Sequence, residues 1–138
     1  DRTITLDKSV LLDKIAGGWA GKMVGVTYGA PTEFKYLGKI IEDSIPWEPK
    51  KIENAKWEDD LYVQMTLMDV MDRKGRNADA KVFQEFFANS GYKLWHANAQ
   101  ARKNYHDSIF PPMSGQPDYN FHADDIDFQI EANFIVMR

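Results

Sequence analysis

Four glycines recur at a strict spacing of four residues near the start of the chain, and this glycine ladder limits what the segment can form. It consists of Gly17, Gly21, Gly25 and Gly29. Each glycine inside a helix costs about 0.5–1 kcal/mol relative to alanine, so a helix that keeps all of them needs the bare backbone for a purpose. Either another helix crosses closely on this face, which is the commoner reason, or the helix end at Gly29 approaches a ligand.

Apolar residues at helical spacing predict that the ladder lies in a helix over residues 9–28. Either Ser9 or Asp7 can cap its N-terminus. The expected apolar stripe consists of Leu11, Ile15, Trp19 and Met23. Residues 30–56 follow, and helix breakers throughout this segment predict an irregular loop. These breakers are Pro31, Gly38, Pro46 and Pro49.

The rest of the chain shows helical patterns separated by turn residues. We expect helices over residues 58–74, from Asn77 to just before Gly91, over residues 94–103, and from Asp124 onward. Leu61, Met65 and Met68 form the apolar face of the first of these, and residues 106–122 form a structured loop. No long segment alternates apolar and polar residues. The sequence therefore predicts an all-α fold, a compact multi-helix bundle, in one domain over residues 1–138.

The composition excludes several classes of function. A net charge of −4 provides no basic surface for nucleic acid, and the absence of cysteine excludes thiolate nucleophiles and thiolate metal sites. The longest apolar run, residues 134–137, is far shorter than the roughly 18 residues that span a membrane. We therefore expect a soluble protein, cytoplasmic or exported after removal of a signal, that binds neither nucleic acid nor membrane. Its oligomeric state is open, and its start at Asp1 fits a processed form or part of a longer chain.

Three consecutive carboxylates, Glu58, Asp59 and Asp60, stand at the start of the second predicted helix. The helix dipole and N-capping favour acidic residues there, so one or two of them need no functional explanation. Three in a row repel one another, and a cation compensates that repulsion. Mg²⁺ fits better than Ca²⁺ because it takes only one or two protein carboxylates and completes its shell from water and substrate. From the residues alone, a magnesium site and a solvated acidic cap are equally open.

A second acidic segment, residues 122–127, precedes the last predicted helix. Asp124 is suited to N-capping, and Asp127 and Glu131 can share a polar face, so structural roles account for most of this segment. The histidines show no spacing typical of metal ligands, and we expect each to have a structural or surface role. They are His96, His106 and His122.

Two segments together resemble the ADP-ribosylglycohydrolase family. Members begin with a helix rich in four-spaced glycines that ends in a Gly-x-Pro-x-Glu-Phe signature, and the counterpart here is Gly29-Ala30-Pro31-Thr32-Glu33-Phe34. A Thr-Asp-Asp-Thr-x-Met-Thr-like motif opens a later helix in the family, and residues 58–66 are its counterpart. Residues 125–131 are similar to a segment of a divergent bacterial branch, so the resemblance covers nearly the whole chain.

The resemblance implies a compact all-α bundle that hydrolyses the bond between ADP-ribose and a protein side chain or related acceptor, using two Mg²⁺ ions. It implies that Asp59 and Asp60 are metal ligands, and that Glu58 replaces the family's threonine ligand and adds a negative charge. It also implies that Glu33 faces the substrate, which makes Glu33 and Asp59 the candidate catalytic residues. Our candidates for binding ADP-ribose or an ADP-ribosylated substrate are Gly29, Glu33, Asp125 and Asp127.

Family members are considerably longer and take their remaining metal ligands from an Asp-x-Asp-Ser/Thr motif near the C-terminus. Asp125 and Asp127 have that spacing, but Phe128 follows them, so we do not equate the two. We therefore expect this chain to be the N-terminal part of such a protein, with only part of the active site. Two alternatives stay open: a truncated, non-catalytic helical domain used for binding or assembly, and a hydrolase of another nucleoside or glycan linkage.

Overall fold

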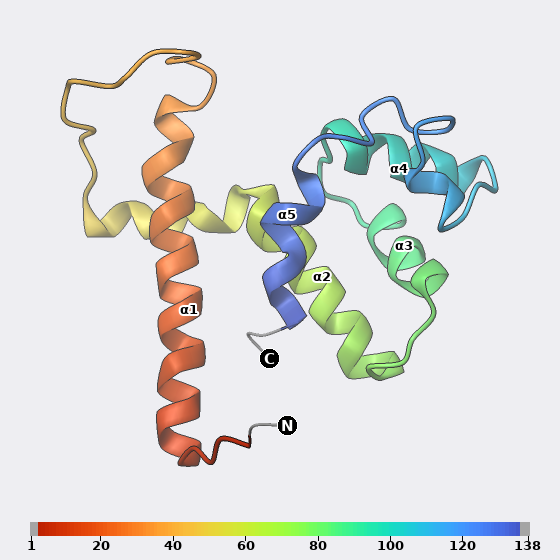
Figure 1. Cartoon of the computed structure of the whole chain (residues 1–138), viewed down its shortest axis with the longest axis horizontal. Helices are drawn as coiled ribbons and strands as arrows, with labels where there is room; N and C mark the ends of the chain where they lie inside the picture. Colours follow the sequence, from red (N-terminus) through yellow and green to blue (C-terminus); the bar gives the residue numbers. More distant parts are fainter. Residues whose placement is uncertain (1–2, 136–138) are drawn as a thin grey trace. The chain divides into compact units, whose positions relative to one another are not determined.

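The computed structural model describes residues 3–135, with the side chain of Phe134 excepted, and these residues form helices and loops only (Figure 1). The prediction of an all-α fold is confirmed. The α-helices are α1 (Lys8–Gly29), α2 (Asp59–Lys74), α3 (Ala80–Ala88), α4 (His96–His106) and α5 (Asp127–Glu131). Shorter 3₁₀ helices are η1 (Ala30–Thr32), η2 (Pro49–Trp57), η3 (Met113–Gly115) and η4 (Ala132–Ile135). Among the described helices, none is both long enough and apolar enough to cross a membrane.

The chain divides into two compact units. Unit 1 extends to Glu58, and unit 2 begins at Asp59. The expectation of a single domain over residues 1–138 concerns how these units combine, and it stays a prediction.

In unit 1, α1 begins where a carboxylate caps it. The backbone N–H of Ser9 donates to Asp7 Oδ1 at 2.8 Å, so Asp7 is the N-cap and Ser9 lies inside the helix. The Ser9 hydroxyl donates to the same oxygen. These hydrogen bonds, the hydroxyl first, lower the pKa of the Asp7 carboxyl below its ordinary value. The predicted helix is confirmed, with Asp7 chosen over Ser9 as its cap.

The glycine ladder of α1 is not covered by other parts of unit 1. Apart from its chain neighbours and the nearby backbone of α1, a β-carbon added at Gly17, Gly21, Gly25 or Gly29 would meet no atom of unit 1 within 4 Å. Close packing of another helix within unit 1 therefore does not account for the ladder. The one buried residue of α1 is Thr27, whose hydroxyl accepts from the indole N–H of Trp47 at 3.0 Å. Leu11, at the start of the expected apolar stripe, is 45% exposed.

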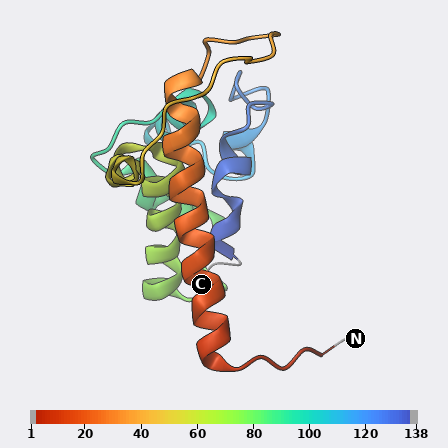
Figure 2. The ribbon, with the colours of Figure 1, turned by 90° about the vertical axis from the view of Figure 1, so that its left-hand side faces the viewer.

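The segment predicted as an irregular loop contains a nine-residue 3₁₀ helix, η2. Pro49 is its first residue, where proline is tolerated because the N–H of that position would lack a helical partner in any case. Helix η2 packs against α1, and it is seen side-on in Figure 1 and end-on in Figure 2. Ala55 of η2 is fully buried. The prolines thus shape this segment without excluding short helices from it.

Unit 2 is built on α2, which supplies most of its apolar core. Val63 and Leu67 of α2 cluster with Leu94, and partly buried side chains pack around them; these include Tyr62, Met68, Met71, Phe83, Phe87, Tyr92 and Ala99. Met65, predicted on the apolar face of this helix, is instead 54% exposed. It is offset from Val63 and Leu67 by two residues, which is about half a helical turn. Gly75 ends the helix with a φ of +87°, as the glycine stop predicts.

Helix α3 begins at Ala80 rather than next to Asn77, so the predicted N-cap was wrong. Asp79 caps the helix, because its carboxylate accepts from the backbone N–H of Lys81 at 2.8 Å. The N–H of Ala78 donates to the Gly75 carbonyl, so Asn77 belongs to the turn that connects α2 with α3.

The last two α-helices also differ from their predicted bounds. Helix α4 runs from His96 to His106, two residues later at its start than expected and three residues later at its end. Helix α5 begins at Asp127 rather than at Asp124, because residues 122–125 form a turn in which the Asp125 N–H donates to the His122 carbonyl at 3.0 Å. The expected apolar end of this helix, residues 134–136, lies largely outside the described residues and side chains.

The capping of α3 gives a direct test of this correction. We expect Asp79→Ala to lower the free energy of unfolding by about 0.5–2 kcal/mol, because the Lys81 N–H loses its acceptor. The matched variant Asn77→Ala should change it by less than about 0.5 kcal/mol. Urea unfolding followed by circular dichroism measures both, and equal losses for the two variants would contradict the assignment.

Candidate functional site

The acidic triplet lies where α2 begins. Glu58 precedes the helix in extended backbone, and Asp59 and Asp60 form its first turn. All three are partly buried, and the Asp60 N–H donates to the Asp59 carboxylate at 3.1 Å. The N-terminal dipole of α2 lowers the cost of holding two carboxylates there.

One turn after Asp60, α2 holds a buried amide that sequence reasoning did not single out. Gln64 is fully buried, and neither its Nε2 nor its Oε1 has a hydrogen-bond partner among the described residues. A spacing of four places Gln64 and Asp60 on the same face of the helix. A buried amide without hydrogen-bond partners costs about 1–3 kcal/mol of folding free energy. Gln64 is therefore an unusual residue among the buried positions of α2, which are otherwise apolar. A glutamine between Val63 and Met65 was the only sequence signal.

The glycine signature and Glu33 lie in unit 1, at the end of α1. Gly29 is the last residue of α1, and Glu33 follows η1 with its side chain exposed. Phe34, the next residue, has a φ of +60°, a left-handed conformation that costs a non-glycine residue about 1–3 kcal/mol. Nearby, Thr32, Lys35 and other side chains of residues 31–46 line a cavity of about 240 Å³. The acidic residues Asp59 and Asp60 belong to unit 2, so the link between Glu33 and these aspartates rests on the sequence motifs.

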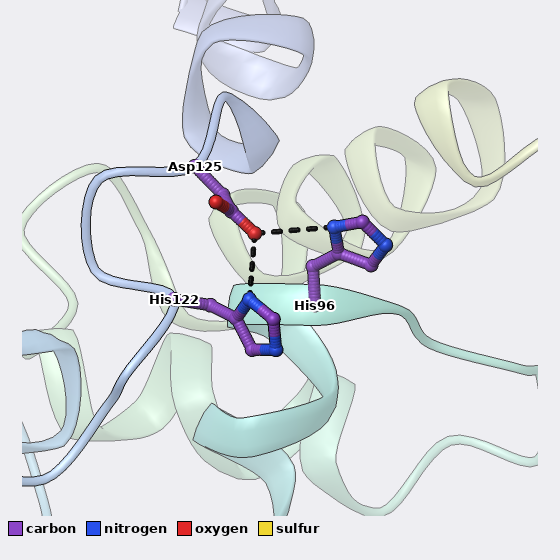
Figure 3. Close-up of side chains that lie close together, drawn as sticks. All are labelled: His96, His122 and Asp125. Atoms are coloured by element: carbon purple, nitrogen blue, oxygen red, sulfur yellow. Dashed lines mark hydrogen bonds and ion pairs between the residues drawn. The ribbon is translucent and has the colours of Figure 1, made fainter. Parts of the chain in front are cut away.

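A second constellation lies entirely in unit 2. Figure 3 shows the imidazoles of His96 and His122 directed at one carboxylate oxygen of Asp125. The Nδ1 atom of His96 lies 3.1 Å from Asp125 Oδ2, and the Nδ1 atom of His122 lies 2.9 Å from the same oxygen. The two ring centroids are 5.2 Å apart, and the ring planes differ by 25°. The fold thus places two imidazoles and a carboxylate in mutual contact.

Asp127, a predicted substrate-binding residue, contacts the start of α4. Its Oδ1 accepts from the backbone N–H of Asn98 at 3.1 Å, and the Asn98 side-chain amide donates to the buried carboxylate of Glu131. Trp95, the residue before α4, supplies no side-chain cap. Asp127 therefore satisfies a free N–H in the first turn of α4 from a distant part of the chain, which is a structural role.

A buried asparagine positions the segment that carries His122. Asn120 is 2% exposed, and its side-chain amide donates to the Ala97 carbonyl at 3.0 Å. Its Oδ1 accepts from the backbone N–H of His122 at 3.1 Å. Asn120 therefore connects the backbone next to His96 with the backbone of His122.

The sequence did not reveal this constellation. His96 and His122 are 26 residues apart in the chain, and only the three-residue spacing of His122 and Asp125 was visible before the fold was known. His106 lies apart from the cluster, at the exposed end of α4, with its ring against Tyr105. The expectation that each histidine has a structural or surface role stays a prediction, but the contact between His96 and His122 was not foreseen.

Comparison with protein-family models identifies the family of the chain. The family model described as ADP-ribosylglycohydrolase matches residues 7–136, which is nearly the whole chain. The chain belongs to the ADP-ribosylglycohydrolase family. The suspected resemblance is confirmed, and it implies an ADP-ribosylglycohydrolase-like hydrolase with ADP-ribosylated substrates. No curated protein and no solved structure matches the chain.

The two motifs on which the resemblance rests lie at the ends of helices. The glycine signature of this ADP-ribosylglycohydrolase family member ends α1, and the acidic motif begins α2. Both stand at helix ends, where some backbone groups lack a partner within the helix.

We expect Asn120→Ala to lower the free energy of unfolding by about 1–3 kcal/mol, because it leaves the Ala97 carbonyl and the His122 N–H without their partner. The control is Gln129→Ala, an exposed position on α5, which should change it by less than about 0.5 kcal/mol. Chemical denaturation measures both values. A loss for Asn120→Ala no larger than that of the control would show that this amide does not fix the segment.

Proposed function

We propose that the protein is a magnesium-dependent hydrolase of ADP-ribosyl linkages, N- or O-glycosidic, and that its metal ligands are Asp59, Asp60 and Glu58. The observation that supports this most directly is the family match over residues 7–136, combined with two adjacent aspartates in the first turn of α2. On this proposal the chain supplies part of a two-metal site.

The donor set fits magnesium rather than a softer ion. Asp59, Asp60 and Glu58 offer carboxylate oxygens only, and Mg²⁺ prefers such hard ligands while it retains several waters. The helix that begins with the two aspartates is held by Val63 and Leu67 in the core of unit 2, so their backbone positions are fixed before any ligand binds. The unpartnered amide of Gln64, on the same face as Asp60, offers a further polar group on that face.

The reaction adds water across the glycosidic bond. The bond between the ribose anomeric carbon and the leaving nitrogen or oxygen breaks, the hydroxyl goes to that carbon, and the proton goes to the leaving group. Bound Mg²⁺ would supply orientation of the ribose hydroxyls and of the attacking water.

The chain's own carboxylates would handle the charge and the proton. We assign Asp59 to accept a proton from the attacking water, and Glu33 to face the substrate and stabilise the positive charge that develops on the sugar. Gly29, which lacks a side chain at the end of α1, leaves the backbone next to Glu33 accessible to the substrate. Of the remaining candidates for substrate binding, Asp127 accepts a hydrogen bond from the first turn of α4, and Asp125 contacts His96 and His122.

Magnesium and ADP-ribose binding test this proposal. We expect the wild-type chain to release heat when ADP-ribose is added with Mg²⁺, and Asp59→Asn and Asp60→Asn each to weaken that binding by at least about tenfold, because each removes a charged ligand. Isothermal titration calorimetry and thermal shift measure both effects. The control is Asp69→Asn on the same helix, where the carboxylate pairs with Arg73 at 2.7 Å on the surface and contributes little.

Hydrolysis is measured in parallel as release of ADP-ribose from an ADP-ribosylated protein. Loss of release in both aspartate variants, with Asp69→Asn active, supports the hydrolase. Magnesium binding without affinity for ADP-ribose would favour a hydrolase of another nucleoside or glycan linkage. Unchanged binding in Asp59→Asn and Asp60→Asn would contradict the proposed ligands and favour the non-catalytic helical domain.

A further inference from the structure

The cluster of His96, His122 and Asp125 in unit 2 has no place in the proposed magnesium chemistry. One ligand atom from each of the three side chains lies within 4.8 Å of the other two. His96 is the first residue of α4, whereas His122 and Asp125 stand in the turn before α5. Two imidazole nitrogens and one carboxylate oxygen held together in this way form a ligand set that a metal ion can bind.

We propose that His96, His122 and Asp125 form a second metal site, which binds a divalent transition-metal ion of the Zn²⁺, Co²⁺ or Ni²⁺ class. Two imidazole nitrogens and one carboxylate oxygen are the ligands that this class prefers. Mg²⁺ prefers oxygen ligands alone, so the cluster and the acidic triplet select different ions.

The two separations between the imidazole nitrogens and the Asp125 oxygen fit one shared ion. Both imidazole nitrogens lie about 3 Å from Asp125 Oδ2, at 3.1 Å for His96 and 2.9 Å for His122. Two ligand atoms that bind one ion at about 2.1 Å lie about 3.0 Å apart when the angle at the metal is near 90°, and about 3.4 Å apart in a tetrahedron. The observed values match the first geometry and reach the second with a shift of a few tenths of an ångström.

Hydrogen bonds from outside the cluster hold its backbone in place. Asn120 connects the Ala97 carbonyl with the His122 N–H, and Asp127 accepts from the Asn98 N–H. Metal sites depend on such supporting contacts, because these orient the ligands before the ion arrives.

The backbone of His96 is itself strained. Its φ is +40°, in the left-handed region, which costs a non-glycine residue about 1–3 kcal/mol. The strained residue is thus the one whose imidazole contacts Asp125.

The cluster is open to solvent on part of its surface. The side chains of His96, His122 and Asp125 are 50%, 33% and 30% exposed. An ion can therefore enter, and three protein ligands leave further coordination positions for water or for a ligand with a donor atom, as in sites that take part in chemistry.

Metal binding must displace a proton from each Nδ1 that donates to Asp125. A neutral imidazole protonated on Nδ1 changes to the Nε2–H tautomer, whereas an imidazolium releases its Nδ1 proton to solvent and keeps the one on Nε2; either change frees the Nδ1 lone pair. The alternative is that the carboxylate simply accepts two hydrogen bonds and no ion binds.

The test uses the dialysed, untagged chain with excess Mg²⁺ present, so that the acidic triplet does not compete for the added ion. Co²⁺ is added, and its visible absorption bands are recorded; Zn²⁺ is titrated by calorimetry. We expect one equivalent to bind, and His96→Ala and His122→Ala each to weaken binding by at least about tenfold. His106→Ala, which changes an exposed histidine outside the cluster, should bind as the wild type does.

Asp125→Asn separates metal binding from hydrogen bonding. The amide oxygen can still accept from the imidazoles, so we expect the thermal stability of the metal-free variant to be retained and its Co²⁺ affinity to fall by at least about tenfold. Asp59→Asn should leave the Co²⁺ bands unchanged, which keeps this result independent of the magnesium proposal.

Two results would overturn the site: folded wild-type protein that shows neither Co²⁺ bands nor Zn²⁺ heat, or equal Co²⁺ affinity in the wild type, His96→Ala and His122→Ala. Circular dichroism of each variant establishes that it is folded.

Discussion

The packing of Val63 and Leu67 against Leu94 is the contact on which unit 2 depends, since it fixes the helix that begins with the acidic residues. Helix α2 carries both apolar core residues and polar residues. Its apolar positions form the core, while Asp59 and Asp60 in its first turn and the buried Gln64 one turn later are polar. A buried amide without a partner opposes folding, so a helix that keeps it must be held by apolar packing elsewhere along its length. The apolar contacts of α2 thus offset the cost of the polar residues in its first turns.

The second half of unit 2 depends on polar contacts rather than on a large apolar core. Asn120, Asn98 and Asp127 connect the first turn of α4 with residues 120–131, and each connection satisfies a backbone or side-chain group that would otherwise be unpaired. Networks of this kind specify one arrangement, because a shift of one residue leaves several groups without partners. The meeting of His96, His122 and Asp125 is a direct consequence of this arrangement.

Local patterns in the sequence were sufficient for the all-α fold and for the bounds of the longest helices, because apolar spacing and glycine stops act within a few residues. The cap of α3 was mispredicted because Asn77 and Asp79 are both good caps, and the turn from Gly75 to Ala78 decides between them. The histidine cluster was missed for a different reason. It depends on tertiary contacts between residues that are 26 positions apart, and hydrophobic periodicity carries no information about such contacts. The motifs around Glu33 and Asp59 were recognisable because each is a short continuous stretch of sequence, which can be compared with a family without knowledge of the fold. The magnesium assignment itself is still a prediction.

The most direct test of the magnesium site is a crystal structure of the chain soaked with Mn²⁺ and ADP-ribose, with data collected at a wavelength where Mn²⁺ scatters anomalously. Mn²⁺ takes the same oxygen ligands as Mg²⁺, and it can be located without ambiguity. We expect an anomalous peak within about 2.3 Å of carboxylate oxygens of Asp59 and Asp60, next to the ribose. Bound ADP-ribose with no anomalous peak at these two aspartates would contradict it.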